Sequence, residues 1–350
     1  MKRHKTKTIK VGKILIGGNA PITVQSMTNT KTEDVKGTVD QIRKLEDAGC
    51  EIVRIAVPSL EAAKVIPKIK KAISIPLVAD IHFNYQLAIK AVEAGANKIR
   101  INPGNIGSKD KVKQILRAAK AKGIPVRIGV NAGSLEKKLI QKYDGITTEG
   151  LVESAINHIH LFEDFGFNNI VLSVKASNVP LTIEANRILS SRTDYPLHLG
   201  ITESGTPHFG ILRSAVGIGA LLAEGIGDTI RVSLTGDPIQ EVRAGYEILK
   251  SLNLRRLGPT IISCPTCGRT HMDIVSVVEK IEEALPKMGK PITVAIMGCE
   301  VNGPGEAKEA DIGIACGKKT ALLFKKGKVI RKIKEEEVIS SLLSEIKKWG

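Results

Sequence analysis

The sequence lacks several features that would place the protein in a membrane or on nucleic acid. It contains no apolar run of the about 18 residues that a membrane-spanning helix requires. Its first segment, MKRHKTKTIKVGKILIGG, is basic but has no apolar core of the kind found in secretory signal peptides. Aromatic residues make up only 3% of the chain, which leaves few side chains on which bases could stack. We therefore expect a cytoplasmic protein that binds neither membranes nor nucleic acid.

The chain is also poor in cysteine. Five cysteines in 350 residues are an odd number, and they do not form the dense, even set of a disulfide-stabilised secreted protein. Free thiols indicate a reducing compartment. With 42% hydrophobic residues, a chain of this length can fill the core of a large domain and of a smaller second one.

Positive charge is in excess. The 52 Lys and Arg residues outnumber 36 Asp and Glu residues, which gives a formal net charge of +16. Residues 318–334 alone carry eight Lys or Arg and no acidic residue. This segment is typical of a solvated hairpin edge, although it could also contact nucleic acid or an acidic electron carrier. The scarcity of aromatic residues argues against nucleic acid.

The most informative motif combines three cysteines and a glutamate. Cys264 and Cys267 enclose a Cys-Pro-Thr-Cys segment, Cys299 follows after 31 residues, and Glu306 closes a Gly/Pro-rich turn. Thiolates suit zinc or iron–sulfur clusters. A zinc site would usually bring a second close Cys or His pair, which is missing here. The spacing therefore favours a cluster with an oxygen ligand on its fourth iron. Zinc, inert cysteines and Cys316 as the fourth ligand are the alternatives.

Strand-like and amphipathic helical segments alternate through most of the chain. The strand-like segments are residues 23–27, 51–57, 76–83, 97–104, 125–133, 169–177, 196–205 and 229–236. Eight βα units over about 250 residues are typical of a (β/α)8 barrel. An open doubly wound sheet is the alternative, but no Gly-x-Gly-x-x-Gly follows the first strand. We predict an α/β fold: a TIM-type barrel over residues 1–254, then a smaller α+β iron–sulfur domain over residues 255–350.

The alternation of residues along the strands predicts an unusually polar barrel lumen. If the aliphatic residues face the helices, the other residues face inward. The inward set is Gln25, Arg54, Asp80, His82, Arg100, Asn102, Arg127, Asn131, Ser173, Lys175, Ser177, His198, Thr202, Arg231 and Ser233. Several buried cations need counter-charge, of which Asp80 and Glu203 supply only part. Because guanidinium groups match phosphate oxygens, the pattern predicts a bound phosphate or diphosphate.

Some individual residues have two interpretations. His82 and His198 can be hydrogen-bonded core residues or acid–base groups, and Asp80 can orient its neighbours or act itself. Glu203 lies at the carboxyl end of the seventh strand, where barrel enzymes place their chemistry. Cys50, between a helix and a strand, is expected to be a packed core thiol.

Taken together, these motifs show that the chain resembles the 4-hydroxy-3-methylbut-2-enyl diphosphate synthase family, in its short two-domain bacterial form. The matching segments are VQSMTNT, VADIHFN, KIRINPGNIG, VRIGVNAGSL, VKAS, LHLGITESG, SCPTCGR and MGCEVNGPGEAKEADIG. They cover nearly the whole chain. Cys316 departs from the pattern, because a small residue such as Gly is expected there.

The resemblance implies an activity and a set of site residues. The expected reaction is the two-electron reductive opening of 2-C-methyl-D-erythritol 2,4-cyclodiphosphate, with ferredoxin or flavodoxin as electron donor. A [4Fe-4S] cluster is expected on Cys264, Cys267, Cys299 and Glu306, and Glu203 is the expected catalytic residue. The expected substrate-binding residues are Arg54, Arg100, Arg127, Asn131, Lys175 and Ser233, to which the inward pattern adds Asp80, His198 and Thr202.

The resemblance also implies a head-to-tail homodimer in which the cluster domain of one chain closes the barrel of the other. Two other hypotheses are compatible with the residues alone. One is a pterin-synthase-like barrel enzyme that acts on a phosphate substrate and carries a structural metal domain. The other is a metal protein that binds nucleic acid.

Overall fold

The computed structural model describes residues 2–285, 291–299 and 307–348. Contacts within the chain divide it into two compact units, residues 1–255 and 256–350. Each unit has its own sheet and its own hydrophobic core. Among the described helices, none is both long enough and apolar enough to span a membrane.

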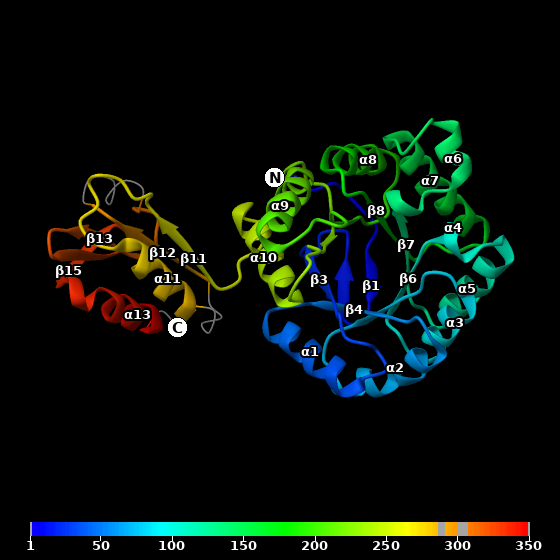
Figure 1. Cartoon of the computed structure of the whole chain (residues 1–350), viewed down its shortest axis with the longest axis horizontal. Coiled ribbons are helices and arrows are strands. Elements are labelled where there is room, and N and C mark those ends of the chain that lie inside the picture. Colours follow the sequence, from blue (N-terminus) through cyan, green and yellow to red (C-terminus); the bar gives the residue numbers. More distant parts are fainter. Residues whose placement is uncertain (1, 286–290, 300–306, 349–350) are drawn as a thin grey trace. The chain divides into compact units, whose positions relative to one another are not determined.

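The first unit is built around eight parallel strands (Figure 1). They are β3 (Thr23–Met27), β4 (Ile52–Ala56), β5 (Leu77–Asp80), β6 (Lys98–Ile101), β7 (Val126–Asn131), β8 (Ile170–Lys175), β9 (His198–Leu199) and β10 (Thr229–Ile230). Their order is β8-β7-β6-β5-β4-β3-β10-β9, and a bridge between Leu172 and Leu197 joins the two end strands. The predicted (β/α)8 barrel is therefore confirmed, and each of the eight predicted segments contains a strand.

Helices surround the strands (Figure 1). The long ones are α1 (Val35–Asp47), α2 (Leu60–Ala72), α3 (Tyr85–Glu93), α5 (Lys109–Ala121), α7 (Thr148–Asp164), α8 (Val179–Arg192), α9 (Pro207–Ala223) and α10 (Pro238–Ser251). Shorter turns are α4 (Pro103–Ile106), η1 (Ala132–Ser134) and α6 (Lys137–Lys142). Several begin at a side chain that accepts a hydrogen bond from the first turn, as Asp34, Ser59 and Asn178 do. The aliphatic residues of the strands pack outward against this ring.

An amino-terminal hairpin, β1 (Ile9–Val11) and β2 (Ile14–Ile16), was not expected from the sequence. Its Val11 and Ile16 form a small apolar cluster with Ile52 and Val78, which lie near the starts of β4 and β5. All four side chains are fully buried. The hairpin therefore closes the amino-terminal end of the barrel and leaves the carboxyl end for the loops that carry chemistry.

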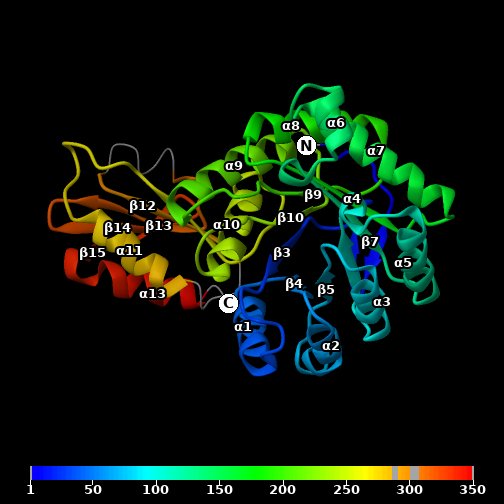
Figure 2. The ribbon, with the colours of Figure 1, turned by 45° about the vertical axis from the view of Figure 1, so that its right-hand side comes forward.

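The second unit is an α+β domain with one mixed sheet. Its strands are β11 (Pro259–Ser263), β12 (Ile292–Met297), β13 (Ile312–Gly317), β14 (Thr320–Lys325) and β15 (Lys328–Lys334), in that order. The first three are parallel, and the last two are antiparallel. The helices α11 (Ile274–Ala284) and α13 (Val338–Lys348), the latter preceded by η3 (Glu335–Glu337), lie along one face of the sheet (Figure 2). The basic strand β15 is the exposed edge of the sheet.

Candidate active site

Six Lys and Arg side chains from five different strands or strand ends converge on the barrel lumen. They are Arg54, Lys98, Arg100, Arg127, Lys175 and Arg231. Four of them are buried, and Arg54 and Arg231 are mostly buried. The alternation along the strands predicts that five of them face inward. Lys98 is the sixth, and because it lies two residues before Arg100 it has the same direction along the strand.

Asp80 at the end of β5 is the counter-ion at the centre of this set. Its Oδ1 lies 3.2 Å from Nη1 of Arg100, and its Oδ2 lies 3.8 Å from Nε of Arg54. The same Oδ2 lies 3.2 Å from Nε2 of His82. Burial alone would raise the pKa of Asp80, but the Arg54 charge, the His82 hydrogen bond and Arg100 hold that pKa well below its usual range. Asp80 is therefore ionised and orients two arginines.

A second carboxylate comes from the helix ring. Glu241 of α10 accepts hydrogen bonds of 3.2 Å from both Nε and Nη2 of Arg231. It also accepts from the hydroxyl of Ser26 and from the backbone N–H of Leu234. Glu241 is 3% exposed, so its carboxylate interacts with these partners and has little contact with solvent. Sequence reasoning missed it because the alternation along strands carries no information about a helix residue.

Two carboxylates do not balance six cations. Within the described chain, Arg127 Nε and Nη1 and Lys98 Nζ are buried without a hydrogen-bond partner, as are His198 Nε2 and the Gln25 amide. Burial lowers the pKa of Arg127 and Lys175 well below the usual values, and neighbouring guanidinium groups lower it further. These groups are costly to bury without a counter-charge. The lumen therefore fits an anion that accepts several hydrogen bonds.

One asparagine and two glycines help to position the basic side chains of the lumen. The hydrogen-bonding surroundings orient the Asn131 amide so that its oxygen accepts from Nη2 of Arg100 at 3.2 Å. A β-carbon at Gly129 would overlap the Arg100 guanidinium, and one at Gly200 would contact Lys175 Nζ. Both glycines therefore leave room for a cation from a neighbouring strand.

Burial also lowers the pKa of His198, and the charges of Arg127 and Lys175 lower it further. Its Nδ1 lies 3.4 Å from the hydroxyl of Thr229. His198 is therefore a neutral group deep in the lumen. This environment suits a hydrogen-bond donor or acceptor better than a cationic acid.

The loops after β9 and β10 carry the other expected residues. Glu203 lies beyond the end of β9, is exposed, and has a φ of 53°, a left-handed conformation that is unusual for a residue with a side chain. Its neighbour Ser204 is buried and donates a hydrogen bond of 2.9 Å to the carbonyl of Ser233. The backbone N–H of Thr202 donates to Ala176. These bonds fix the turn that presents Glu203.

Three residues of the inward set lie past the ends of their strands. Ser177 lies past the end of β8 and is exposed. The His82 side chain is 50% exposed, although its ring reaches Asp80. Asn102 is buried, but its Oδ1 caps α4 by accepting from the N–H of Gly104 at 3.1 Å. In each case the strand has ended, so the period of two no longer applies.

In the second unit, the cysteine segments follow neighbouring parallel strands. Cys264 comes directly after β11, and Cys299 comes shortly after β12, with which β11 pairs. The N–H of Gly298 donates to Sγ of Cys264 at 3.0 Å. Cys267 is exposed in the same loop as Cys264, whereas Cys316 is fully buried in the core of the unit.

Three of the four expected cluster ligands lie in the described residues. Glu306, the expected fourth ligand, lies outside the described residues. Within the described ranges, no group of three or more Cys, His, Asp or Glu side chains is placed to hold a metal ion. The structure thus brings the Cys264 and Cys299 segments together and leaves the ligand set a prediction.

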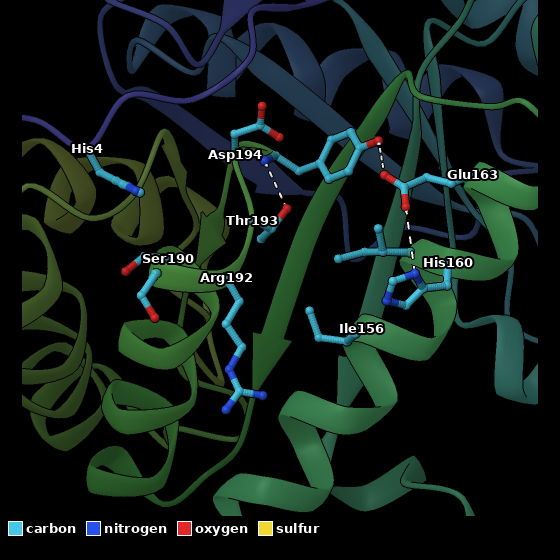
Figure 3. Close-up of a pocket in the computed structure, with 11 residues that line it drawn as sticks. His4, Ile156, His160, Glu163, Ser190, Arg192, Thr193 and Asp194 are labelled. Carbon is cyan, nitrogen blue, oxygen red and sulfur yellow. Dashed lines mark hydrogen bonds and ion pairs between the residues drawn. The ribbon is translucent and has the colours of Figure 1, made fainter.

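A pocket of about 460 Å³ lies elsewhere, between the carboxyl-terminal ends of α7 and α8 (Figure 3). These helix ends belong to the amino-terminal side of the barrel. Glu163 in this pocket contacts the Tyr195 hydroxyl at 3.0 Å and His160 at 3.9 Å. Since its lining has charges of both signs, the pocket lacks the cationic excess of the lumen.

Comparisons with known proteins cover nearly the whole chain. A family model described as the GcpE TIM-barrel domain matches residues 6–246, and one described as the GcpE protein C-terminal domain matches residues 260–348. The 4-hydroxy-3-methylbut-2-en-1-yl diphosphate synthases (flavodoxin) of Ruminiclostridium cellulolyticum and Caldanaerobacter subterraneus are 58% and 59% identical over 346 residues. Each alignment covers 99% of this chain and 98% of the relative.

Solved structures of dihydropteroate synthases share the fold. Those from Stenotrophomonas maltophilia and Vibrio fischeri match 71% of this chain and 97% and 98% of their own, with TM-scores of 0.53 and 0.52. At 16% and 15% identity they support the barrel fold alone. The two family models and the relatives of matching length settle the family: this chain belongs to the GcpE family.

Proposed function

We propose that the chain converts 2-C-methyl-D-erythritol 2,4-cyclodiphosphate to 4-hydroxy-3-methylbut-2-enyl diphosphate, with a flavodoxin as the electron donor. The reaction opens a ring C–O bond, releases one hydroxyl group as water, and consumes two electrons and one proton. The observation that carries this proposal is the lumen, where six Lys and Arg side chains face two carboxylates. The names of the relatives point to the same chemistry.

The barrel, residues 1–254, is proposed to bind the diphosphate. Arg54 and Arg100 are already held by Asp80, so they can receive an anion without a large rearrangement. Arg127 and Lys175 supply the unbalanced charge, and a bound dianion removes the cost of burying them. Asn131, Ser233, Thr202 and His198 are proposed to complete the hydrogen bonds to the substrate.

The second domain, residues 255–350, is proposed to hold a [4Fe-4S] cluster. The donor set fits this group, because Cys264, Cys267 and Cys299 are soft thiol ligands and Glu306 adds an oxygen. The N–H of Gly298 donates to Cys264 Sγ, a contact that stabilises a thiolate. When bound, the cluster would pass electrons from the carrier to the substrate one at a time. Such a cluster requires the reducing conditions of the cytoplasm.

Glu203 is proposed to be the catalytic acid. A hydroxyl group leaves more easily as water than as hydroxide, so a nearby carboxylic acid accelerates its departure. The fixed turn around Ser204 presents the Glu203 side chain beyond the carboxyl end of β9. That is the end of the barrel at which TIM-barrel enzymes carry their active sites.

The active unit is proposed to be a head-to-tail homodimer, in which the cluster domain of one chain serves the barrel of the other. A mixture of Glu203→Gln and Cys267→Ser chains tests this assembly. Co-assembled chains should regain activity that neither variant has alone. A verified heterodimer without activity, or an active monomer, would contradict the shared site.

The proposed function is tested by anaerobic purification followed by iron, sulfide and zinc analysis and by a turnover assay with reduced flavodoxin. About four irons and four sulfides per chain are expected. Arg100→Ala should retain the cluster and lose substrate affinity, which separates the two parts of the site. Stoichiometric zinc without acid-labile sulfide, or no conversion of the cyclic diphosphate, would disprove the proposal.

A further inference from the structure

Lys98 is a buried lysine that is not among the residues proposed above to bind the diphosphate. It opens β6, and the parallel register places it beside Val78 on β5, just as Arg100 lies beside Asp80. The side chain of Lys98 is 0% exposed. Its Nζ has no hydrogen-bond partner in the described parts of the chain. Lys98 therefore lies one layer below the Arg100–Asp80 pair, closer to the closed end of the barrel.

The floor beneath Lys98 is apolar. Val78 packs with Val11 and Ile16 of the amino-terminal hairpin, and all three are fully buried. The hairpin's own lysines, Lys10 and Lys13, are exposed. The hairpin thus excludes solvent from this end of the barrel and offers no charge to the Lys98 amine.

The charged neighbours on the other elements are mostly cations. The charges of Arg127 on β7 and Arg54 on β4 disfavour a charge on Lys98, and His198 on β9 is a further neighbour of the amine. Lys175 on β8 and Arg231 after β10 add positive charge to the same lumen. The carboxylates of Asp80 and Glu241 form ion pairs with Arg100 and Arg231, respectively. In the described residues, nothing balances a charge on Lys98.

An ammonium group in these surroundings is unstable, whereas a neutral amine is tolerated. Burial lowers the pKa of Lys98 well below its usual value, and the charges of Arg127 and Arg54 lower it further. A diphosphate in the lumen would reverse this balance, because its charge favours protonation of nearby amines. The direction of the change follows from the geometry. Among the described residues both nearby carboxylates already pair with arginines, so an anion bound in the lumen would supply the counter-charge for the amine.

We propose that Lys98 is uncharged in the ligand-free barrel and takes up a proton from solvent when the diphosphate binds, so that it becomes the deepest cation of the anion site. Lys98 can act in this way only if the barrel binds a diphosphate, as proposed above. Proton uptake on binding makes the affinity fall as the pH rises between the free and the bound pKa values of Lys98.

The test is titration calorimetry of the anaerobically prepared holoprotein with the cyclic diphosphate, without a reductant. Each phosphorus of this ligand carries one strongly acidic oxygen, so the ligand itself does not titrate near neutral pH. Binding enthalpies measured in PIPES, HEPES and Tris give the number of protons taken up. Wild-type protein should take up about one proton, and its Kd should rise up to about tenfold per pH unit.

The variant Lys98→Met keeps the length of the side chain but cannot bind a proton. It should bind the ligand with no proton uptake and with little dependence on pH. Its ligand-free form should unfold at a higher temperature than wild type, because an apolar side chain replaces a buried amine without a partner. Lys10→Met, the same substitution on the exposed hairpin, is the control and should leave both proton uptake and affinity unchanged.

Three outcomes would overturn the role of Lys98. The first is ligand binding by wild-type protein without proton uptake, a measurement that needs no variant. The second is undiminished uptake in Lys98→Met, which would assign the proton to another buried group, such as Lys175 or His198. In both of these the proposed function stands. The third, no binding of the cyclic diphosphate to wild-type protein, would contradict the proposed function itself and the role of Lys98 with it.

Discussion

Gly129 on β7 makes room for the guanidinium group of Arg100 on the neighbouring strand β6. A β-carbon at residue 129 would overlap Nε of Arg100 and would lie 2.9 Å from its Nη2, closer than real β-carbons approach such atoms. Asp80 and Asn131 hold the same guanidinium from other directions. The lack of a side chain at residue 129 therefore allows Arg100 to take the position in which it can bind an anion.

Replacing Gly129 with Ala should therefore displace Arg100 and weaken binding of the cyclic diphosphate. The loss should approach that of removing a buried charged contact, about 2–5 kcal/mol, while the iron content stays normal. Calorimetric Kd values measure it. Gly219→Ala in α9, where nothing lies within 4 Å of the added carbon, is the control and should bind normally. Wild-type affinity in Gly129→Ala would show that Arg100 is not a ligand contact.

Much of this lumen could be predicted from the sequence, because a strand alternates its faces with a strict period of two. That period correctly placed Arg54, Arg100, Arg127 and Lys175 inward. It gave no information about Glu241, which reaches the lumen from a helix. The same period also points Lys98 inward, two residues before Arg100, although Lys98 is not in the inward set given above.

Other features depend on tertiary structure. The hairpin that closes the barrel is formed by two strands of three residues each, in a segment whose basic composition suggests solvent exposure. Only its packing on Ile52 and Val78 shows its role. The spacing predicts the cysteine segments, yet only the pairing of β11 with β12 explains why Cys264 lies beside the turn that carries Gly298 and Cys299.

Asp80→Asn should destabilise the ligand-free protein. The change leaves Arg54 and Arg100 buried without their counter-charge, and breaking a buried pair in this way costs about 3–5 kcal/mol. Urea unfolding at neutral pH measures the free energy of unfolding. Saturating inorganic pyrophosphate should recover part of the loss. The exposed pair Lys36–Asp40 provides the control, since Asp40→Asn should cost no more than about 0.5 kcal/mol.

The contribution of Asp80 should also depend on pH in a defined direction. Its pKa is lower in the folded protein than in the unfolded chain, so the folded state favours the ionised form. The stabilisation is fully present above the unfolded-state value of about 3.9 and is lost as the pH falls through the folded-state value. The difference in unfolding free energy between wild type and Asp80→Asn should therefore be constant from neutral pH down to about pH 5. A difference that already shrinks between pH 7 and pH 6 would contradict an ionised Asp80.

Cys316→Val should leave the cluster intact. Cys316 is fully buried in the apolar core of the second domain, with Ile314 on its own strand and Leu323 on the adjacent one. Valine has a similar volume and keeps this packing, whereas Cys264→Ser removes a proposed ligand. Iron and sulfide contents after anaerobic purification should be normal in the first variant and lost in the second. Loss of iron in Cys316→Val would make this thiol a cluster ligand in place of Glu306.

Glu203→Gln tests the proposed acid at the carboxyl end of the barrel. Glutamine keeps the size of the side chain and most of its hydrogen bonds, but it cannot supply a proton to the leaving hydroxyl group. Cluster assembly and substrate affinity should stay near normal, while turnover falls by at least about a hundredfold. The alternative is that Glu203 serves only to shape its turn, and a loss of binding in proportion to rate would favour that structural role.

The backbone of Glu203 offers a second way to separate these roles. Its φ of 53° lies in the left-handed region, which costs a residue with a side chain about 1–2 kcal/mol and costs glycine almost nothing. Glu203→Gly should therefore unfold at a temperature at least equal to that of wild type, because the strain is relieved, and yet be as inactive as Glu203→Gln. A turn with only a structural role would tolerate glycine and keep its turnover. If Glu203→Gly is stable and active, the proton must come from another group, and Glu203 is not the acid.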